Sequence, residues 1–324
     1  MREAASAVLG PRQTGFWQEK GGACPLPHPG PLLEGEGAAA VLPGNRLHLQ
    51  HGPIDLVCQA WGDPAEVRAA CRQAAAAFPA ILPALCMEMA ALRAPLPSPP
   101  PQGPVAQAMH AACTPHAGQF ITPMAAVAGA VADAVLRAMT AGRTLERTCV
   151  NNGGDIAFHL SPGQSLRCGL VAELAAPALD GVFTLHHAAP SRGIATSGRA
   201  CKGQGGRSFS FGIADAVTVL ARTAAEADAA ATVVANAVDL PGHPAVRRHP
   251  ADDIDPGTDL GSRLVTWDLG PLTPAEVDRA LDAGRRTADA LRARGLIHGA
   301  VLALRGRVVA CLPPACLDAT LEPA

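Results

Sequence analysis

The segment Val150–Leu160, VNNGGDIAFHL, most restricts how this chain can fold. Two strand-like runs, 145–150 and 155–160, are separated by Asn-Asn-Gly-Gly, which is typical of a tight turn between antiparallel strands. Apolar residues alternate along the second run, so one of its faces is expected to be buried. The sequence therefore predicts a hairpin inside a sheet. Asp155 stands at the mouth of this hairpin, where it either stabilises the turn or faces a ligand.

Two alanine-rich segments are expected to form helices that pack against this sheet, and the small residues of the first allow a very close approach. The first, MAAVAGAVADAVLRAM, follows Thr122 and Pro123, which suit the N-cap and the first helical position. Thr122 could instead face an anion at the helix N-terminus, and one side chain could serve both purposes. The second helix is predicted to begin at the capping-box sequence Thr223–Glu226 and to end near Ala237.

The rest of the chain supplies further strands and helices. Capping boxes at Asp63–Glu66 and Thr273–Glu276 begin two helices, and the run 46–61 is expected to form a hairpin. Strands are predicted at 166–174, 182–187, 208–213, 216–221, 262–269, 296–304 and 307–311. The fold class is therefore α/β in the broad sense (α+β), a mixed, mostly antiparallel sheet packed with alanine-rich helices. We expect a Gly/Pro-rich N-terminal arm at 1–42, one domain at 43–315 and a tail at 316–324.

Composition excludes several classes of partner. The net charge is −2 and only 3% of the 324 residues are aromatic, with no Tyr, which argues against nucleic-acid binding. No uninterrupted apolar run has membrane-spanning length, so no membrane contact is expected. The ten cysteines form no CxxC pair, and the start of the chain lacks the pattern of a signal peptide. These features predict a protein of the reducing cytoplasm.

A glycine-rich loop follows residue 193. It begins with Ala195, Thr196, Ser197 and Gly198 and continues through three cations, Arg199, Lys202 and Arg207. Glycine backbone can approach a ligand closely, and successive N–H groups with nearby cations suit a phosphate. The alternative is a surface loop with no ligand, and the loop by itself favours neither interpretation.

Asp228 and Thr232 lie four residues apart on the second alanine-rich helix, so they share a face. A carboxylate and a hydroxyl on adjacent turns can supply two oxygen ligands to a hard cation such as Mg²⁺. The alternative is an exposed Asp and a neutral Thr without a ligand.

Several motifs together resemble the ApbE-like superfamily. They are FITPMAAVAGAVAD (120–133), VNNGGDIAFHL (150–160), GIATSG (193–198), GRSFSFGIADAVTVLA (206–221), ADAAATVVANAVDLPGHP (227–244) and DLGSRLVT (259–266). The closer similarity, over about residues 46–312, is to a bacterial and archaeal family related to the ApbE FAD:protein FMN transferases. Those transferases split FAD with Mg²⁺ and attach FMN to a Thr or Ser of an acceptor protein.

The resemblance implies a role for each matching position. Asp228 and Thr232 match the metal-binding segment and would hold Mg²⁺. Asp155, in the Gly-Asp-Ile match, and Asp215 would act as auxiliary catalytic acids. The nucleotide would contact Thr122, Gly153, Gly154, Ala195, Thr196, Ser197, Gly198 and Arg207. One segment departs from the pattern, because residues 208–215 replace a His-His-Ile-Ile-Asp-Pro-type sequence, and Asp215 could substitute for the lost Asp.

Three functions follow as hypotheses. The first is a Mg²⁺-dependent transferase that acts on a nucleotide containing a pyrophosphate, with FAD as the first candidate. The second is a non-catalytic flavin or nucleotide carrier. The third is a metabolic enzyme with different chemistry on the same scaffold, since a fold does not fix a function. The expected partners are a small nucleotide, an acceptor protein in the transferase case, and a second copy of the chain in a homodimer.

Overall fold

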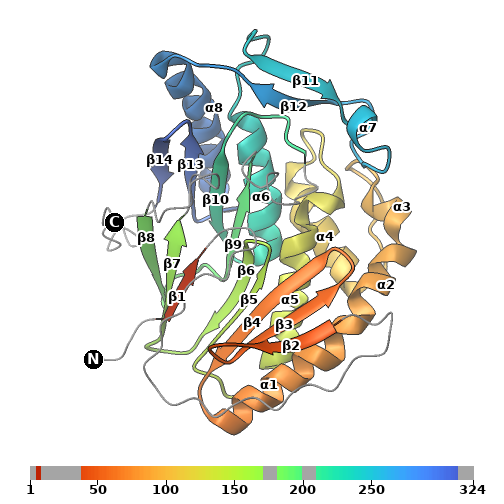
Figure 1. Ribbon diagram of the computed structural model, residues 1–324, viewed down its shortest axis with the longest axis vertical. Coiled ribbons are helices and arrows are strands. Elements are labelled where there is room, and N and C mark those ends of the chain that lie inside the picture. Colours follow the sequence, from red (N-terminus) through yellow and green to blue (C-terminus); the bar gives the residue numbers. More distant parts are fainter. Residues whose placement is uncertain (1–4, 9–37, 171–180, 199–208, 313–324) are drawn as a thin grey trace.

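A nine-stranded sheet runs through the computed structural model, which describes residues 5–8, 38–170, 181–198 and 209–312 (Figure 1). All neighbouring strands of this sheet pair antiparallel. In spatial order they are β14 (Arg307–Cys311), β13 (Gly299–Leu304), β10 (Ala216–Ala221), β9 (Gly193–Ser197), β6 (Asp155–Leu160), β5 (Arg147–Asn152), β4 (Ile54–Trp61), β3 (Arg46–His51) and β2 (Ala38–Leu42). The predicted fold class is confirmed, and the sheet begins within the segment expected to be an arm.

Helices cover one face of the sheet. They are α1 (Pro64–Ala77), α5 (Val127–Thr140), α6 (Ala224–Ala237) and α8 (Pro274–Ala293). Side chains alternate between the two faces of a strand, and Val150, Ala157, Ala195 and Val217 turn inward to join the same core as these helices. Alanine and valine on both sides allow helix and sheet to approach closely, as the sequence predicted for the first alanine-rich helix.

A smaller sheet packs against the other face. It has the order β1 (Ala5–Val8), β7 (Ser165–Leu170) and β8 (Gly181–His186). Ile156, Phe158 and Ile194 point towards it and form a second core with Leu166 and Leu185. The central strands are therefore buried on both faces, which explains why every residue of β10 is buried, the polar Thr218 included.

Further elements surround these layers. After α1 the chain forms a 3₁₀ turn (Phe78–Ala80) and the helices α2 (Ile81–Met87) and α3 (Met89–Leu92). Helix α4 follows at Pro104–Cys113. A separate two-stranded sheet, β11 (Val246–Pro250) and β12 (Leu264–Leu269), lies at the top of Figure 1 with the short helix α7 (Ala251–Ile254). The sequence predicted β12 but neither α4 nor β11.

Three local predictions are wrong. Residues 209–212 form no strand, because their polar groups bond to other elements: the N–H of Thr266 donates to Ser210 O at 2.9 Å. Thr122 does not cap a helix through its side chain, since Pro123–Ala126 is a 3₁₀ turn and α5 begins at Val127. Glu66 does not complete a capping box with Asp63. Its side chain instead accepts hydrogen bonds from Arg143 and from the N–H of Thr144. The capping box at Thr273 is confirmed.

Two helical stretches, Pro64–Met87 and Pro123–Thr140, are long and apolar enough to span a membrane by length and composition. Charged residues such as Arg72 and Asp133 interrupt both stretches, so neither is the uninterrupted apolar run that the sequence analysis looked for. Both contribute buried residues to the main core, among them Ala70, Phe78, Val131 and Val135. A core helix of an α/β protein passes the same test, so these helices are weak evidence for a membrane protein.

Candidate functional site

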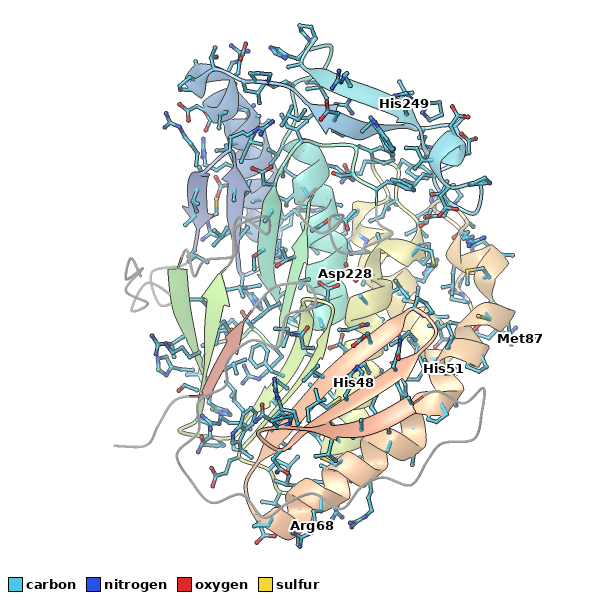
Figure 2. The ribbon with its side chains drawn as sticks, viewed as in Figure 1. His48, His51, Arg68, Met87, Asp228 and His249 are labelled. Carbon is cyan, nitrogen blue, oxygen red and sulfur yellow. The ribbon has the colours of Figure 1, made fainter. Side chains whose placement is uncertain are left out.

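Asp155 and Asp228 form a pair of half-buried carboxylates where α6 lies over the sheet. Asp155 is the first residue of β6 and shares the helix-facing side of that strand with Ala157. Asp228 lies in the second turn of α6, near the centre of the molecule (Figure 2). The negative charges of Asp155 and Asp228 interact. The spacing of residues along α6 could not reveal this interaction, because Asp155 lies on a strand.

Burial raises the pKa of both carboxyl groups. The pKa of Asp155 rises to about 7, and a hydrogen bond from the N–H of Thr196 (3.2 Å) only partly opposes this change. The pKa of Asp228 is raised well above its usual value, first by burial and then by the charge of Asp155. Two carboxylates that repel each other in a poorly solvated place bind a proton or a cation in preference to remaining doubly charged.

The N-terminus of α5 meets this pair. Asp228 Oδ2 accepts a hydrogen bond from the N–H of Gly129 at 3.0 Å, and the N–H of Ala128 also donates to this carboxylate. Asn152, on the same face of the sheet as Val150, donates from Nδ2 to Ala128 O at 3.0 Å. The N-terminus of a helix favours negative charge, so Asp228 has a structural role whether or not a ligand binds.

Close packing of the two helices places Asp228 there. A Cβ at Gly129 would lie 2.2 Å from Ala224 O, so only glycine allows this approach. Asp133, a buried residue of α5, accepts hydrogen bonds from the N–H groups of Ala224 (3.1 Å) and Ala225 (2.9 Å) at the start of α6. The sequence analysis assigned no role to Asp133. An acidic residue inside an otherwise apolar helix could have indicated that its carboxylate has a buried partner.

Cys113 and Thr232 border the acidic pair. Thr232 lies one turn after Asp228 on α6, as the four-residue spacing predicted, and its side chain is partly exposed. Cys113, the last residue of α4, has a thiol pKa raised by burial and then by the charge of Asp228. This thiol therefore stays protonated, and Cys113 is not suited to act as a nucleophile.

Gly153 and Gly154 form the predicted turn between β5 and β6. Both have positive φ, +66° and +114°, and the N–H of Gly154 donates to Asn151 Oδ1 at 2.8 Å. A Cβ at either position would have no described atom within 4 Å. Backbone conformation therefore requires glycine here, and the turn leaves open space directly before Asp155.

Side chains of the predicted phosphate loop point to opposite faces of the sheet. The Thr196 hydroxyl bonds Thr218 across the strands (2.9 Å), on the face opposite Asp155, so only the Thr196 N–H reaches the acidic pair. Ser197 pairs with Val217 and faces the helices with Ala195. Gly198, with φ +136°, allows contact with Asp215, because a Cβ there would lie 2.6 Å from Asp215 O. Arg207, Arg199 and Lys202 lie outside the described residues.

Asp215 and Thr122 bind other parts of the fold. Asp215 Oδ2 accepts a hydrogen bond from the N–H of Arg305 (2.5 Å) in the turn between β13 and β14. Thr122 Oγ1 donates to Asp259, in the connection between α7 and β12. The structure therefore gives both residues partners that hold connections in place, whereas it brings Asp155, Asp228 and Ser197 towards the same face.

The donor set at the acidic pair suits a hard divalent cation. The described residues contain no cluster of three or more His, Cys, Asp or Glu side chains that could hold a metal alone. Two carboxylates with neighbouring hydroxyl oxygens match Mg²⁺, which is commonly bound by one or two carboxylates and completed by water and substrate phosphates. The residues present therefore fit the cation that the resemblance implies.

The sequence of this chain is similar to known proteins, and one family pattern matches most of its length. Similar proteins include the "UPF0280 protein" of Methanoregula boonei, 38% identical over 178 residues that cover 52% of this chain and 68% of the relative. That of Methanosphaerula palustris is 35% identical over 51% of this chain and 67% of the relative. That of Methanothermobacter thermautotrophicus is 39% identical over 123 residues, and the match spans only 44% of that relative. The family pattern described as AbpE bacteria matches residues 38–310, from β2 to β14, and this chain therefore belongs to that family.

Proposed function

We propose that Asp228 and Thr232 bind Mg²⁺ beside Asp155, and that the bound cation receives the pyrophosphate of a nucleotide such as FAD. The observation that carries this proposal is the carboxylate pair, whose pKa values are raised by burial. A divalent cation relieves the repulsion between the two carboxylates, and it supplies the charge neutralisation that a pyrophosphate needs.

The surrounding residues have matching roles in this proposal. The hydrogen bonds from α5 leave further lone pairs of Asp228 available, because an ionised carboxylate has about four acceptor sites. The open space at the Gly153–Gly154 turn and the helix-facing side of Ser197 would accommodate the nucleotide. The described cysteines are all free thiols, which supports the expected cytoplasmic location.

FMN transfer to a Thr or Ser of an acceptor protein is the reaction that the resemblance implies. In it the acceptor oxygen forms a bond to the FMN phosphorus, the pyrophosphate bond breaks, and AMP leaves. The second candidate, a nucleotide carrier without transfer, is favoured by residues 208–215, which lack the His-His-Ile-Ile-Asp-Pro-type sequence of the transferases. Asp215, which could substitute for the lost Asp, accepts a hydrogen bond from the N–H of Arg305 in the turn between β13 and β14.

The test is binding of FAD to the full chain with and without Mg²⁺, measured by calorimetry and by thermal stability. Asp228→Asn is the informative variant, because an amide oxygen can still accept from Gly129 while the charge is lost, whereas alanine would also remove the cap. Asp282→Asn, on the exposed face of α8, is the matched control. We expect FAD to raise the melting temperature only with Mg²⁺, and only in the wild type and the control.

Release of AMP, followed by chromatography, then separates the two candidates. Mg²⁺-dependent AMP release identifies a transferase or hydrolase, and stoichiometric binding without release identifies a carrier. No response to saturating FAD with Mg²⁺ contradicts both, and it would leave the third hypothesis, an enzyme with another substrate.

A further inference from the structure

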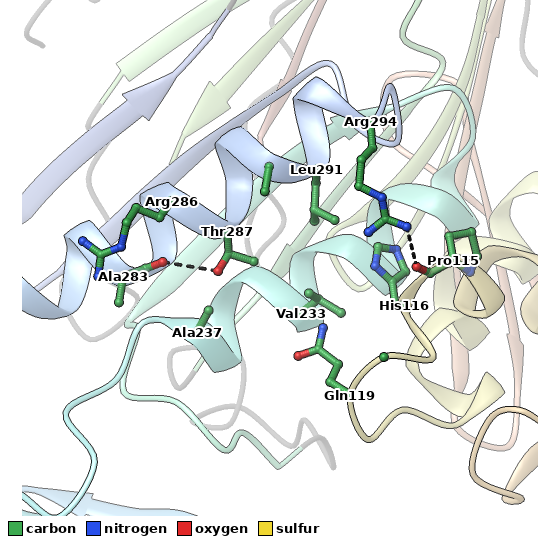
Figure 3. A pocket seen from close by; sticks show the side chains of 12 residues that line it. Pro115, His116, Gln119, Val233, Ala237, Ala283, Arg286, Thr287, Leu291 and Arg294 are labelled. Carbon is green, nitrogen blue, oxygen red and sulfur yellow. Dashed lines mark hydrogen bonds between the residues drawn. The ribbon is translucent and has the colours of Figure 1, made fainter.

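A groove of about 680 Å³ lies between α6 and α8, and neither residue of the acidic pair lines it. Its walls come from α8, from the second half of α6 and from residues 115–119, which follow α4 (Figure 3). Its volume is within the range of small-molecule sites, which is about 300–1,000 Å³.

Two arginines stand at opposite ends of this groove (Figure 3). Arg286 and Arg294 both project from α8 and are eight residues apart, which corresponds to roughly 12 Å along a helix. Arg286 has no hydrogen bond or ion pair with any described residue, and within the same part of the chain the Arg294 guanidinium donates only to Pro115 O, at 2.9 Å. None of the residues that line the groove is acidic. The positive charge of the groove is therefore not compensated within the described part of the chain.

The remaining arginines of this stretch of α8 differ in this respect. Arg285 pairs with Asp282 and Asp289, and Arg292 also pairs with Asp289. Among the arginines between positions 285 and 294, the two that face the groove have no carboxylate partner among the described residues. An arginine in this position can offer several N–H donors to an anionic oxygen.

His116 is the second observation that indicates a ligand. Its side chain lines the groove beneath Arg294, is only 5% exposed, and its Nδ1 has no hydrogen-bond partner. Burial and the charge of Arg294 lower its pKa to about 4, so the ring is neutral at pH 7. A buried polar atom without a partner is uncommon in folded proteins, and an anion bound by Arg294 would favour the protonated ring.

The surface between the two arginines is apolar. Val233 and Ala237 of α6 face Ala283, Ala290 and Leu291 of α8. Small side chains here leave room for a flat or narrow organic body. Gln119 and Thr287 add polar side chains to the lining, and the Thr287 hydroxyl donates to Ala283 O at 3.3 Å. A ligand would therefore have both an apolar part and a charged group.

We propose that this groove is a second binding site, for a small organic anion. Arg294 and Arg286 bind its phosphate or carboxylate oxygens, and its apolar part lies on the alanines of α6 and α8. The site does not depend on the cation site, and none of its residues belongs to the acidic pair.

The test uses the full chain and four probes: phenyl phosphate, benzoate, inorganic phosphate and phenol. The first two carry both an apolar ring and an anionic group, whereas the last two carry only one of these features. Binding is measured by NMR, from the His116 ring signals, and by calorimetry. We expect saturable binding of phenyl phosphate or benzoate, an upward shift of the His116 pKa, and weaker binding of the other two probes.

Variants then assign the binding to the groove. Arg294→Ala and Arg286→Ala should each raise the dissociation constant at least fivefold, and Arg294→Lys should weaken it less than Arg294→Ala does. Arg279→Ala, an exposed arginine of the same helix outside the groove, is the control and should have no effect. Asp228→Asn should also leave the binding unchanged, so that failure of the cation site is distinguished from failure of this one. Absence of binding by both ring-containing anions, or an equal loss in Arg279→Ala, would overturn the proposal.

Discussion

Asp133 and Asp228 each bind the N-terminus of the helix that carries the other. Asp133, on α5, accepts from the N–H groups of Ala224 and Ala225 at the start of α6. Asp228, on α6, accepts from Gly129 near the start of α5. These reciprocal hydrogen bonds fix the contact between the two helices, so Asp228 is held in place before any cation binds.

Replacement of Asp133 should destabilise the fold. In Asp133→Ala, the buried N–H groups of Ala224 and Ala225 lose their acceptor, and each unsatisfied group costs about 1–3 kcal/mol. We expect the free energy of unfolding, measured in urea, to fall by at least about 2 kcal/mol. The control is Asp282→Ala, an exposed residue of α8, which should change it by less than about 0.5 kcal/mol. Equal effects in both variants would show that Asp133 is not a cap.

Gly129→Ala tests the close approach of α5 and α6. The new methyl group would lie 2.2 Å from Ala224 O, so the helices must separate. Overpacking of this kind costs about 1–3 kcal/mol, and more where backbone has to move. Gly118→Ala is the control, because a Cβ there meets no described atom within 4 Å. A Gly129→Ala protein as stable as the wild type would contradict the packing described above.

The raised pKa of Asp155 predicts how stability depends on pH. Its folded pKa of about 7 lies above the unfolded value, so the folded state binds the proton more tightly. The free energy of unfolding should therefore fall as the pH rises from about 4 to about 7, by up to about 1.4 kcal/mol per pH unit for one proton, and then level off.

Chemical unfolding between pH 4 and 8, with a chelator present, measures this slope. Asp155→Asn should flatten it and should be more stable than the wild type at pH 8. Added Mg²⁺ should stabilise the wild type most above pH 7, where the proton no longer neutralises the pair. A slope unchanged by Asp155→Asn would mean that other groups cause the pH dependence.

Thiol reactivity should distinguish Cys86 from Cys113. Cys86 is exposed, whereas burial and the charge of Asp228 keep the Cys113 thiol protonated. With Ellman's reagent, Cys86→Ser should lose one rapidly reacting thiol, and Cys113→Ser should lose none until the protein is unfolded. Rapid labelling of Cys113 in the native protein would show that the acidic pair is more open to solvent than described.

Local patterns determined most of the elements and their order. The Asn-Asn-Gly-Gly turn, the alternation in β6 and the capping box at Thr273 each depend on neighbours in the chain, and each is found in the structure. The spacing of Asp228 and Thr232 likewise placed them on adjacent turns of one helix. Turns, caps and helical periodicity involve only a few consecutive residues, which is why the sequence alone predicts them.

Only the tertiary structure decided what these residues contact. Thr122 bonds Asp259 and Asp215 bonds Arg305, partners that are distant in the sequence, and residues 209–212 bond to β12 in place of forming a strand. The pairing of Asp155 with Asp228 and the groove between α6 and α8 also depend on how closely the helices pack. Glycines and buried hydrogen bonds between separate segments set the distance between packed elements. No local pattern in the sequence predicts this distance.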